Sequence, residues 1–174
     1  MTFEIYKNLG EINALTPADA EAVFLDCCGS REWARSMTKA RPFRMVEDLF
    51  QCAAKKWFAL PPADWLEAFA AHPKIGSSKP AASQKKQAAK WSKGEQAGAS
   101  TTDAKTKTAL AELNRLYEEK FGFIFIVCAT GKTAKEMLAI CKARLGNSVE
   151  TELRLAASEQ QKITEIRLAK LLEK

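Results

Sequence analysis

The sequence predicts an all-α protein with a single compact domain built from several helices. Helix-start signals recur along the chain, and the apolar residues between them repeat at three- or four-residue spacing, as on one face of a helix. Only one run, residues 121–129, has the aromatic and β-branched composition of a buried strand. A chain of 174 residues is long enough to bury one core. We therefore expect one domain over residues 1–174.

Two helices are expected between residues 16 and 42. Thr16 can cap the first helix, with Pro17 at its first position and Gly29 at its end. Ser30 can cap the second helix. This helix should end near Pro42, because the residue before a proline disfavours the helical conformation.

Two more helices are expected before residue 72. Apolar residues spaced four apart define one face of the third helix: Met45, Leu49, Ala53 and Trp57. The pair Pro61-Pro62 should end that helix. Residues 64–69 then form a short helix that leads directly to His72.

Three longer segments with helical signals occupy the second half of the chain. Asp103 starts a helix with this apolar stripe: Leu110, Leu113, Tyr117 and Phe121. Thr133 and Glu136 match the Thr-x-x-Glu capping box at the start of the next helix. The last and longest helix should run over 148–172, with these residues inward: Val149, Leu153, Ala156, Ile163 and Ile166.

The run over residues 121–129, Phe-Gly-Phe-Ile-Phe-Ile-Val-Cys-Ala, is ambiguous. Its composition alone favours a buried strand. A single strand would have no partner in an otherwise helical chain. The remaining interpretations are a buried helix and an extended stretch that lines a site.

The cysteines and the first residues indicate a cytoplasmic protein. The five cysteines include the adjacent pair Cys27 and Cys28 but no C-x-x-C motif, so buried free thiols in a reducing compartment are expected. One histidine and no paired ligand spacing make a zinc site unexpected. Residues 1–5 lack the features of a signal peptide, and the longest apolar run is too short to cross a bilayer.

The formal net charge of +6 is concentrated in one part of the chain. Residues 74–94 contain six lysines and no acid, and residues 77–90 read as a lysine-rich surface connection. Such a segment can attract an anionic small molecule or nucleic acid. A small helical nucleic-acid-binding module is the alternative interpretation, but Trp91 is the only aromatic residue nearby for base stacking.

His72 is the only histidine and the first candidate for acid/base chemistry. The simpler interpretation is a histidine that caps a helix end or packs in the core. Its position between a short helix and a Gly/Ser loop, in basic surroundings, favours a functional role. Nearby lysines would disfavour the imidazolium, so a neutral His72 could accept a proton.

Ser92 and Glu95 are the second candidates. Ser-x-x-Glu is itself a capping box, so the pair can simply start a helix. The functional interpretation is that the same cap aims Glu95 and Gln96 at an anion. Burial would raise the pKa of Glu95, and nearby lysines would oppose this effect.

Two basic motifs each allow a functional and a simpler interpretation. Arg167 borders the inward stripe of the last helix, where it can pair with a glutamate on the same helix or clamp a carboxylate or ureide. Gly131-Lys132-Thr133 resembles the end of a phosphate-binding loop. That motif needs a glycine five residues earlier, where the chain has Ile126, so nucleotide binding is not expected.

Taken together, the motifs resemble the OHCU (2-oxo-4-hydroxy-4-carboxy-5-ureidoimidazoline) decarboxylase family. The blocks that carry the resemblance are Ala71-His72-Pro73-Lys74-Ile75-Gly76, the segment Trp91-Ser92-Lys93-Gly94-Glu95-Gln96-Ala97-Gly98, and residues 113–123, 128–132, 144–147 and 162–168. This chain has Lys74-Ile75 where the family more often shows Arg-Leu, and its lysine-rich connection is a few residues longer than usual.

The resemblance implies an all-α, single-domain, homodimeric enzyme that converts OHCU into (S)-allantoin in urate breakdown, without metal or organic cofactor. It implies that residues 121–129 form a buried helix or near-helix. It also implies a catalytic pair, His72 and Glu95, and a set of substrate contacts: Pro73, Ser92, Gln96, Phe121, Phe123, Ile124, Ile126 and Arg167. The partner would be an anionic small molecule, not nucleic acid or a membrane.

Overall fold

The computed structural model describes residues 9–77, 81, 86–100 and 102–173, and in these ranges the chain is all-α. Its helices are α1 (Leu9–Ala14), α2 (Pro17–Cys28), α3 (Arg31–Lys39), α4 (Val46–Phe58), α5 (Pro62–Ala70), α6 (Lys86–Glu95), α7 (Ala97–Ser100), α8 (Ala104–Phe121), α9 (Ala134–Arg144) and α10 (Val149–Leu172). The described ranges contain no strand. The predicted fold class is confirmed. Half of the lysine-rich connection over 77–90 lies outside the described residues, and α6 already begins inside it.

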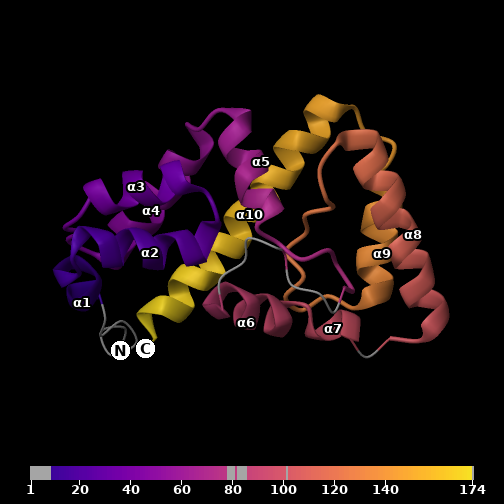
Figure 1. Ribbon diagram of the computed structural model, residues 1–174, viewed down its shortest axis with the longest axis horizontal. Coiled ribbons are helices and arrows are strands. Elements are labelled where there is room, and N and C mark those ends of the chain that lie inside the picture. The colour runs from indigo at the N-terminus through magenta and orange to yellow at the C-terminus, as the bar shows by residue number, and fades with distance from the viewer. Residues whose placement is uncertain (1–8, 78–80, 82–85, 101, 174) are drawn as a thin grey trace.

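The 24-residue helix α10 is the centre of the fold. It crosses the molecule and contacts α2, α4, α5 and α8 (Figure 1). On one side α2, α3 and α4 pack together, and on the other side α8 packs against α9. One continuous apolar core therefore surrounds α10, with Trp33, Trp57 and Leu168 among its fully buried side chains.

Local side-chain capping explains where half of the described helices begin. The side-chain oxygens of Thr16, Ser30, Asp103, Thr133 and Ser148 each accept a hydrogen bond from a backbone N–H in the first turn of the following helix. These bonds satisfy donors that have no partner inside the helix. Every one of these starts was predicted from the sequence.

Gly29 ends α2 with a left-handed backbone (φ 90°) that favours glycine. It also lies against the end of α5, where an added Cβ would stand 2.8 Å from the Cβ of Ala71. A side chain here would push α2 away from the turn that carries His72.

Three expectations about helix faces and limits were wrong. Met45 and Val149, expected inward, are 57% and 53% exposed, because each lies at the very start of its helix. Ser92 and Glu95 do not start a helix but lie at the C-terminal end of α6. The short helices α1 and α7 were not expected.

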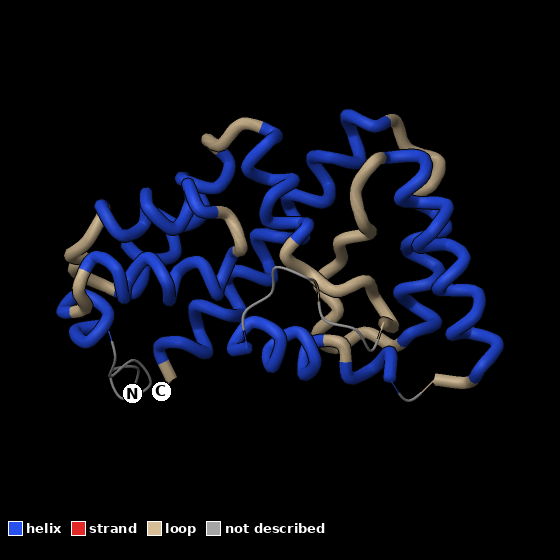
Figure 2. Tube along the Cα trace, viewed as in Figure 1, coloured by secondary structure: helices blue, strands red, loops and turns tan. Residues whose placement is uncertain are grey.

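Residues 122–129 are neither a strand nor the helix that the resemblance implied. They form an irregular extended segment in the interior (Figure 2). Gly122 ends α8 with φ 77°, and side chains from neighbouring helices then satisfy the backbone. Arg144 donates to the Ile126 carbonyl at 2.7 Å, and Glu159 accepts from the Cys128 N–H at 2.7 Å. The extended alternative is therefore the correct one.

A buried charged network holds the far side of this segment. Tyr117 donates its hydroxyl proton to Glu152, which also accepts from Arg144 at 2.6 Å and from Asn147 at 2.9 Å. Glu152 is fully buried, so its charge depends on these partners. The network joins α8, α9 and α10 behind the extended segment.

Candidate active site

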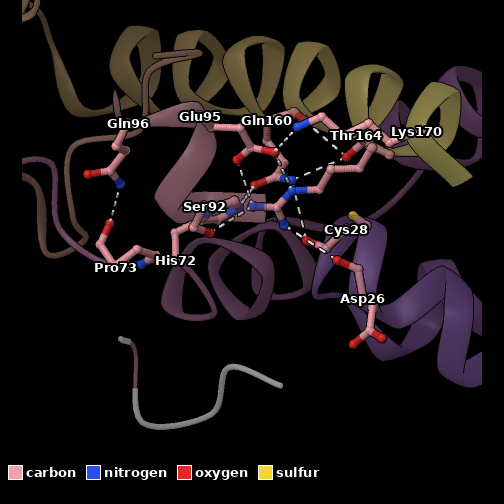
Figure 3. Close-up of polar contacts among 11 residues, drawn as sticks. Asp26, Cys28, His72, Pro73, Ser92, Glu95, Gln96, Gln160, Thr164 and Lys170 are labelled. Carbon is pink, nitrogen blue, oxygen red and sulfur yellow. Dashed lines mark hydrogen bonds and ion pairs between the residues drawn. The ribbon is translucent and has the colours of Figure 1, made fainter. Parts of the chain in front are cut away.

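One face of α10 organises the candidate active site. Gln160, Ile163, Thr164 and Arg167 follow one another at three- and four-residue spacing, and all four are buried. Figure 3 shows Gln160 and Thr164 close to side chains from α6, α2 and the turn after α5. This face therefore collects residues that lie far apart in the sequence.

His72 lies in the turn after α5, where its backbone N–H donates to the Phe69 carbonyl at 3.1 Å. Its Nε2 atom is 2.6 Å from Oε1 of Gln160, and the side chain is buried. Burial, reinforced by the nearby charge of Arg167, lowers the pKa of His72 to about 3. The imidazole is therefore neutral at physiological pH, as expected. The cause differs from the expected one, because burial and Arg167, and not the nearby lysines, lower the pKa of His72.

Glu95 and Arg167 form a buried two-pronged ion pair. Arg167 Nε donates to Glu95 Oε1 at 3.0 Å, and Arg167 Nη2 donates to Glu95 Oε2 at 2.9 Å. The same Nη2 donates to Ser92 Oγ at 2.9 Å. Lys170 lies 3.6 Å from Glu95 Oε1. The pairing of Arg167 with a surface glutamate of its own helix, one of the two interpretations, is wrong, because its partner comes from α6.

This pairing sets the charge of Glu95. Burial pushes the pKa of the Glu95 carboxyl upward, but the hydrogen bonds and charge of Arg167, assisted by Lys170, hold the pKa below its usual range. Burial and an opposing positive charge were both expected, but the charge that outweighs burial comes mainly from Arg167. In this arrangement Glu95 is an ionised carboxylate that accepts hydrogen bonds.

Gln96 braces the turn that carries His72. Its Oε1 accepts from the Gly76 N–H at 3.1 Å, and its Nε2 donates to the Pro73 carbonyl at 3.4 Å. Asn114 of α8 donates to the Ile75 carbonyl at 2.9 Å and supports the same turn. The His-Pro-Lys-Ile-Gly segment is thus held from two sides.

A pocket of about 320 Å³, open solvent at its mouth included, lies between these elements. The lining residues are His72, Pro73, Ile75, Ser92, Glu95, Gln96, Phe125, Ile126, Val127, Ala129 and Ile163. Polar groups stand on one wall, and the extended segment 125–129 forms another. A small polar ligand could thus meet a neutral imidazole, a carboxylate and apolar contacts together.

The structure brings most of the predicted site residues together. Six of them line the pocket: His72, Pro73, Ser92, Glu95, Gln96 and Ile126. Arg167 stands directly behind Glu95 and Ser92.

Three predicted substrate contacts do not line the pocket: Phe121, Phe123 and Ile124. Phe121 and Phe123 stack around Tyr117 in an aromatic cluster, with ring centroids 4.6 Å and 5.8 Å from it. Phe121 still belongs to α8, and the part of the extended segment that lines the pocket begins only at Phe125.

Gln160 was missed by the sequence analysis, although it makes the shortest contact to His72. Its signal is its spacing, because it precedes Arg167 by seven residues, or two helical turns, and so shares its face. Glu159, which accepts a hydrogen bond from the backbone of the extended segment, was not predicted either.

The described residues contain neither a cluster of metal ligands nor a membrane-spanning helix. No group of three or more His, Cys, Asp and Glu side chains there could hold a metal ion. No described helix is long and apolar enough to span a bilayer. All five cysteines are free, and only Cys52 is not fully buried.

Comparison with known proteins gives consistent matches. The family model described as "OHCU decarboxylase" matches residues 13–169. The uric acid degradation bifunctional protein TTL of Arabidopsis thaliana is 48% identical over 147 residues, which cover 83% of this chain and 45% of that protein. A 2-oxo-4-hydroxy-4-carboxy-5-ureidoimidazoline decarboxylase of Amia calva is 37% identical over 84 residues, 47% of this chain and 48% of that protein.

A solved structure also matches, the crystal structure of OHCU decarboxylase in the presence of (S)-allantoin. It has a TM-score of 0.76 and 42% sequence identity, and the match covers 87% of this chain and 97% of the other. The match to the two proteins above spans about half of their length. None of these matches supports the alternative of a nucleic-acid-binding module.

Proposed function

The chain belongs to the OHCU decarboxylase family, and we propose that it decarboxylates OHCU to (S)-allantoin without a cofactor. The observation that carries this proposal is the pocket in which neutral His72 and ionised Glu95 face one small space. Such a pair can handle protons for an anionic substrate on opposite sides of one reacting centre. It is also the catalytic pair that the sequence motifs predict.

The substrate supplies its own electron sink. OHCU carries its carboxylate on a carbon that also bears a hydroxyl, and the neighbouring ring carbon belongs to a C=N bond. When the C–C bond to the carboxylate breaks, CO2 leaves and the electron pair flows into that C=N bond. The ring nitrogen that receives the electron pair takes up a proton from water, and the enol-like intermediate takes up a proton on carbon as its hydroxyl proton is lost. The protein must therefore orient the substrate, move protons and expose one face.

His72 is proposed to contact the hydroxyl or the carboxylate of the substrate. A neutral imidazole can accept the hydroxyl proton as the enol-like intermediate becomes a carbonyl. Burial holds the pKa of His72 low. The imidazolium would therefore return its proton readily and not trap the intermediate.

Glu95 is proposed to act as the partner acid/base. It is ionised next to Arg167, so it must first take up a proton, which the substrate hydroxyl releases, before it can deliver one to carbon. Its fixed position in the pocket would confine that delivery to one face and so give one enantiomer. Arg167 then acts mainly by holding Glu95, since its donor fork is already engaged there.

The other walls would hold the ureide and the ring. Ser92, Gln96 and Pro73 line the pocket beside the catalytic pair, and residues 125–127 and Ala129 line it from the extended segment. Binding of the ring amide by backbone groups of residues 121–126 remains a prediction from the resemblance. Direct substrate contacts by Phe121, Phe123 and Ile124 remain predictions from the resemblance. The aromatic cluster supports at least an indirect role for the first two, because it supports the extended segment.

The test is stereochemical. OHCU is generated in situ from urate with urate oxidase and hydroxyisourate hydrolase, and the circular dichroism of the allantoin is followed with and without this protein. We expect fast formation of one enantiomer with the protein and slow formation of racemic allantoin without it. Racemic allantoin at the uncatalysed rate in both samples would contradict the proposal.

Two further predictions from the sequence concern the oligomeric state and the location of the protein, which we propose are a homodimer and the cytoplasm. Five free cysteines are consistent with a reducing compartment. Light scattering after size-exclusion chromatography tests the first prediction, and fractionation of the source cells tests the second. A mass of one chain in solution would contradict the homodimer.

A further inference from the structure

His72 is paired with a second buried side chain that no motif had singled out. Its Nε2 atom stands 2.6 Å from Oε1 of Gln160, and Gln160 is completely buried. A neutral imidazole carries its one proton on either Nδ1 or Nε2. Which nitrogen carries it follows from what its hydrogen-bond partner can offer.

The surroundings of Gln160 settle how its amide is turned. Its Nε2 lies 3.3 Å from the Cys28 carbonyl and 3.2 Å from the Thr164 hydroxyl oxygen. The Thr164 hydroxyl donates its own proton to the backbone carbonyl of Gln160 at 3.0 Å, so toward the side-chain amide it can only accept. Both neighbours therefore require a donor.

A flipped amide is excluded by the same contacts. It would place Oε1 against the Cys28 carbonyl, two acceptors face to face in a buried space, and would lose both hydrogen bonds. With the amide fixed, the atom that faces His72 is a carbonyl oxygen. This oxygen can accept a proton but cannot donate one.

We propose that Gln160 is a positioning residue that fixes His72 in the Nε2–H tautomer, which makes Nδ1 the nitrogen that exchanges protons with the substrate. Among the described residues, Nδ1 makes no hydrogen bond, and His72 lines the pocket. The chain Cys28 carbonyl, Gln160 amide, His72 imidazole thus sets the direction of proton transfer. The role in catalysis rests on the proposed decarboxylase activity, whereas the tautomer does not.

The experiment uses the fact that His72 is the only histidine in the sequence. Protein labelled with ¹⁵N-histidine gives a single imidazole in a long-range ¹H–¹⁵N spectrum, which reports directly which nitrogen is protonated. We expect Nε2–H in the wild type near neutral pH. A spectrum of the Nδ1–H tautomer or of the imidazolium would overturn the proposal, whatever the enzymatic activity proves to be.

Variants connect the tautomer to catalysis. Gln160→Met removes the acceptor at similar size, so the imidazole should lose its single tautomer and kcat should fall roughly tenfold or more, with a smaller change in KM. The matched control is Gln161→Met, a neighbouring buried glutamine that bonds to Glu165 and not to His72. It should keep the wild-type spectrum and kcat.

Each outcome has a distinct meaning. A Gln160→Met protein that retains both the Nε2–H spectrum and the wild-type kcat refutes the positioning role. Should this variant fail to fold, Thr164→Val, which removes one of the two acceptors that orient the amide, is expected to mix the tautomers in the same way. Should OHCU not be a substrate at all, the spectra still decide the tautomer.

Discussion

The buried pair of Arg167 and Glu95 gives the sharpest stability prediction. Arg167→Met removes two charge-assisted hydrogen bonds to Glu95 and one to Ser92 and leaves a carboxylate whose side chain is 8% exposed. Breaking a buried ion pair on one side costs about 3–5 kcal/mol. Lys170, at 3.6 Å, can compensate in part, so the lower limit of about 3 kcal/mol applies.

A loss of this size is measurable without unfolding the protein. Domains are typically stable by about 5–15 kcal/mol. For a chain of this length, 1 kcal/mol lowers Tm by about 2–4 °C, so the variant should melt roughly 6–12 °C below the wild type. Urea unfolding, followed by fluorescence of the buried Trp33 and Trp57, gives the free energy of unfolding independently.

The pH dependence of the free energy of unfolding shows whether the lost ion pair causes the lower stability of Arg167→Met. In the wild type the pKa of Glu95 is depressed, so the pair stabilises the fold above the unfolded pKa, and this contribution disappears as the pH falls through the folded pKa. Without Arg167, burial remains the largest influence and raises the pKa of Glu95, so the variant loses stability as the pH rises. The deficit should therefore be large near pH 7 and shrink toward pH 4.

The matched control is Arg154→Met, which breaks an exposed ion pair with Glu150 on the same helix. It should hardly change the free energy of unfolding, because exposed pairs contribute little. The reasoning is refuted if Arg167→Met is as stable as the wild type near pH 7, or if its deficit is the same at pH 7 and pH 4.5.

Three further predictions concern catalysis and packing. His72→Ala and Glu95→Ala should each lower kcat by roughly a hundredfold or more with unchanged far-ultraviolet circular dichroism. Near-normal activity in a folded variant would contradict the catalytic role of the replaced residue. Because the pKa of His72 is about 3, the profile of kcat/KM against pH should show no step near 6.5, and such a step would contradict the buried, neutral imidazole. Gly98→Ala should lower Tm, because its Cβ would collide with the backbone carbonyl oxygen of Lys132, whereas Gly94→Ala, with open space around it, should raise Tm slightly.

The helix starts were predictable because their causes are local. A cap such as Thr16, Ser30 or Thr133 bonds to a backbone N–H three residues away, and the sequence displays both partners together. The Ser92-x-x-Glu95 pattern misled for the same reason. It has the spacing of a cap, but it lies on the last turn of α6, where the two side chains point together at Arg167.

The extended segment shows the opposite case. Composition alone left a strand, a helix and an extended stretch open for residues 121–129. The choice depended on Arg144 and Glu159, which satisfy its backbone from helices that lie 18 and 31 residues further along the chain. Propensity describes a residue and its neighbours, so it contains no information about these partners.

The sequence by itself determined the helical fold class, most helix boundaries and six of the side chains that line the pocket. Only the tertiary structure decided their chemical states. Gln160 lies 88 residues from His72, and Arg167 lies 72 residues from Glu95. The tautomer of the first pair and the charge of the second depend on buried contacts across these distances. Burial and pairing act through space, and they change a pKa only after the chain has folded.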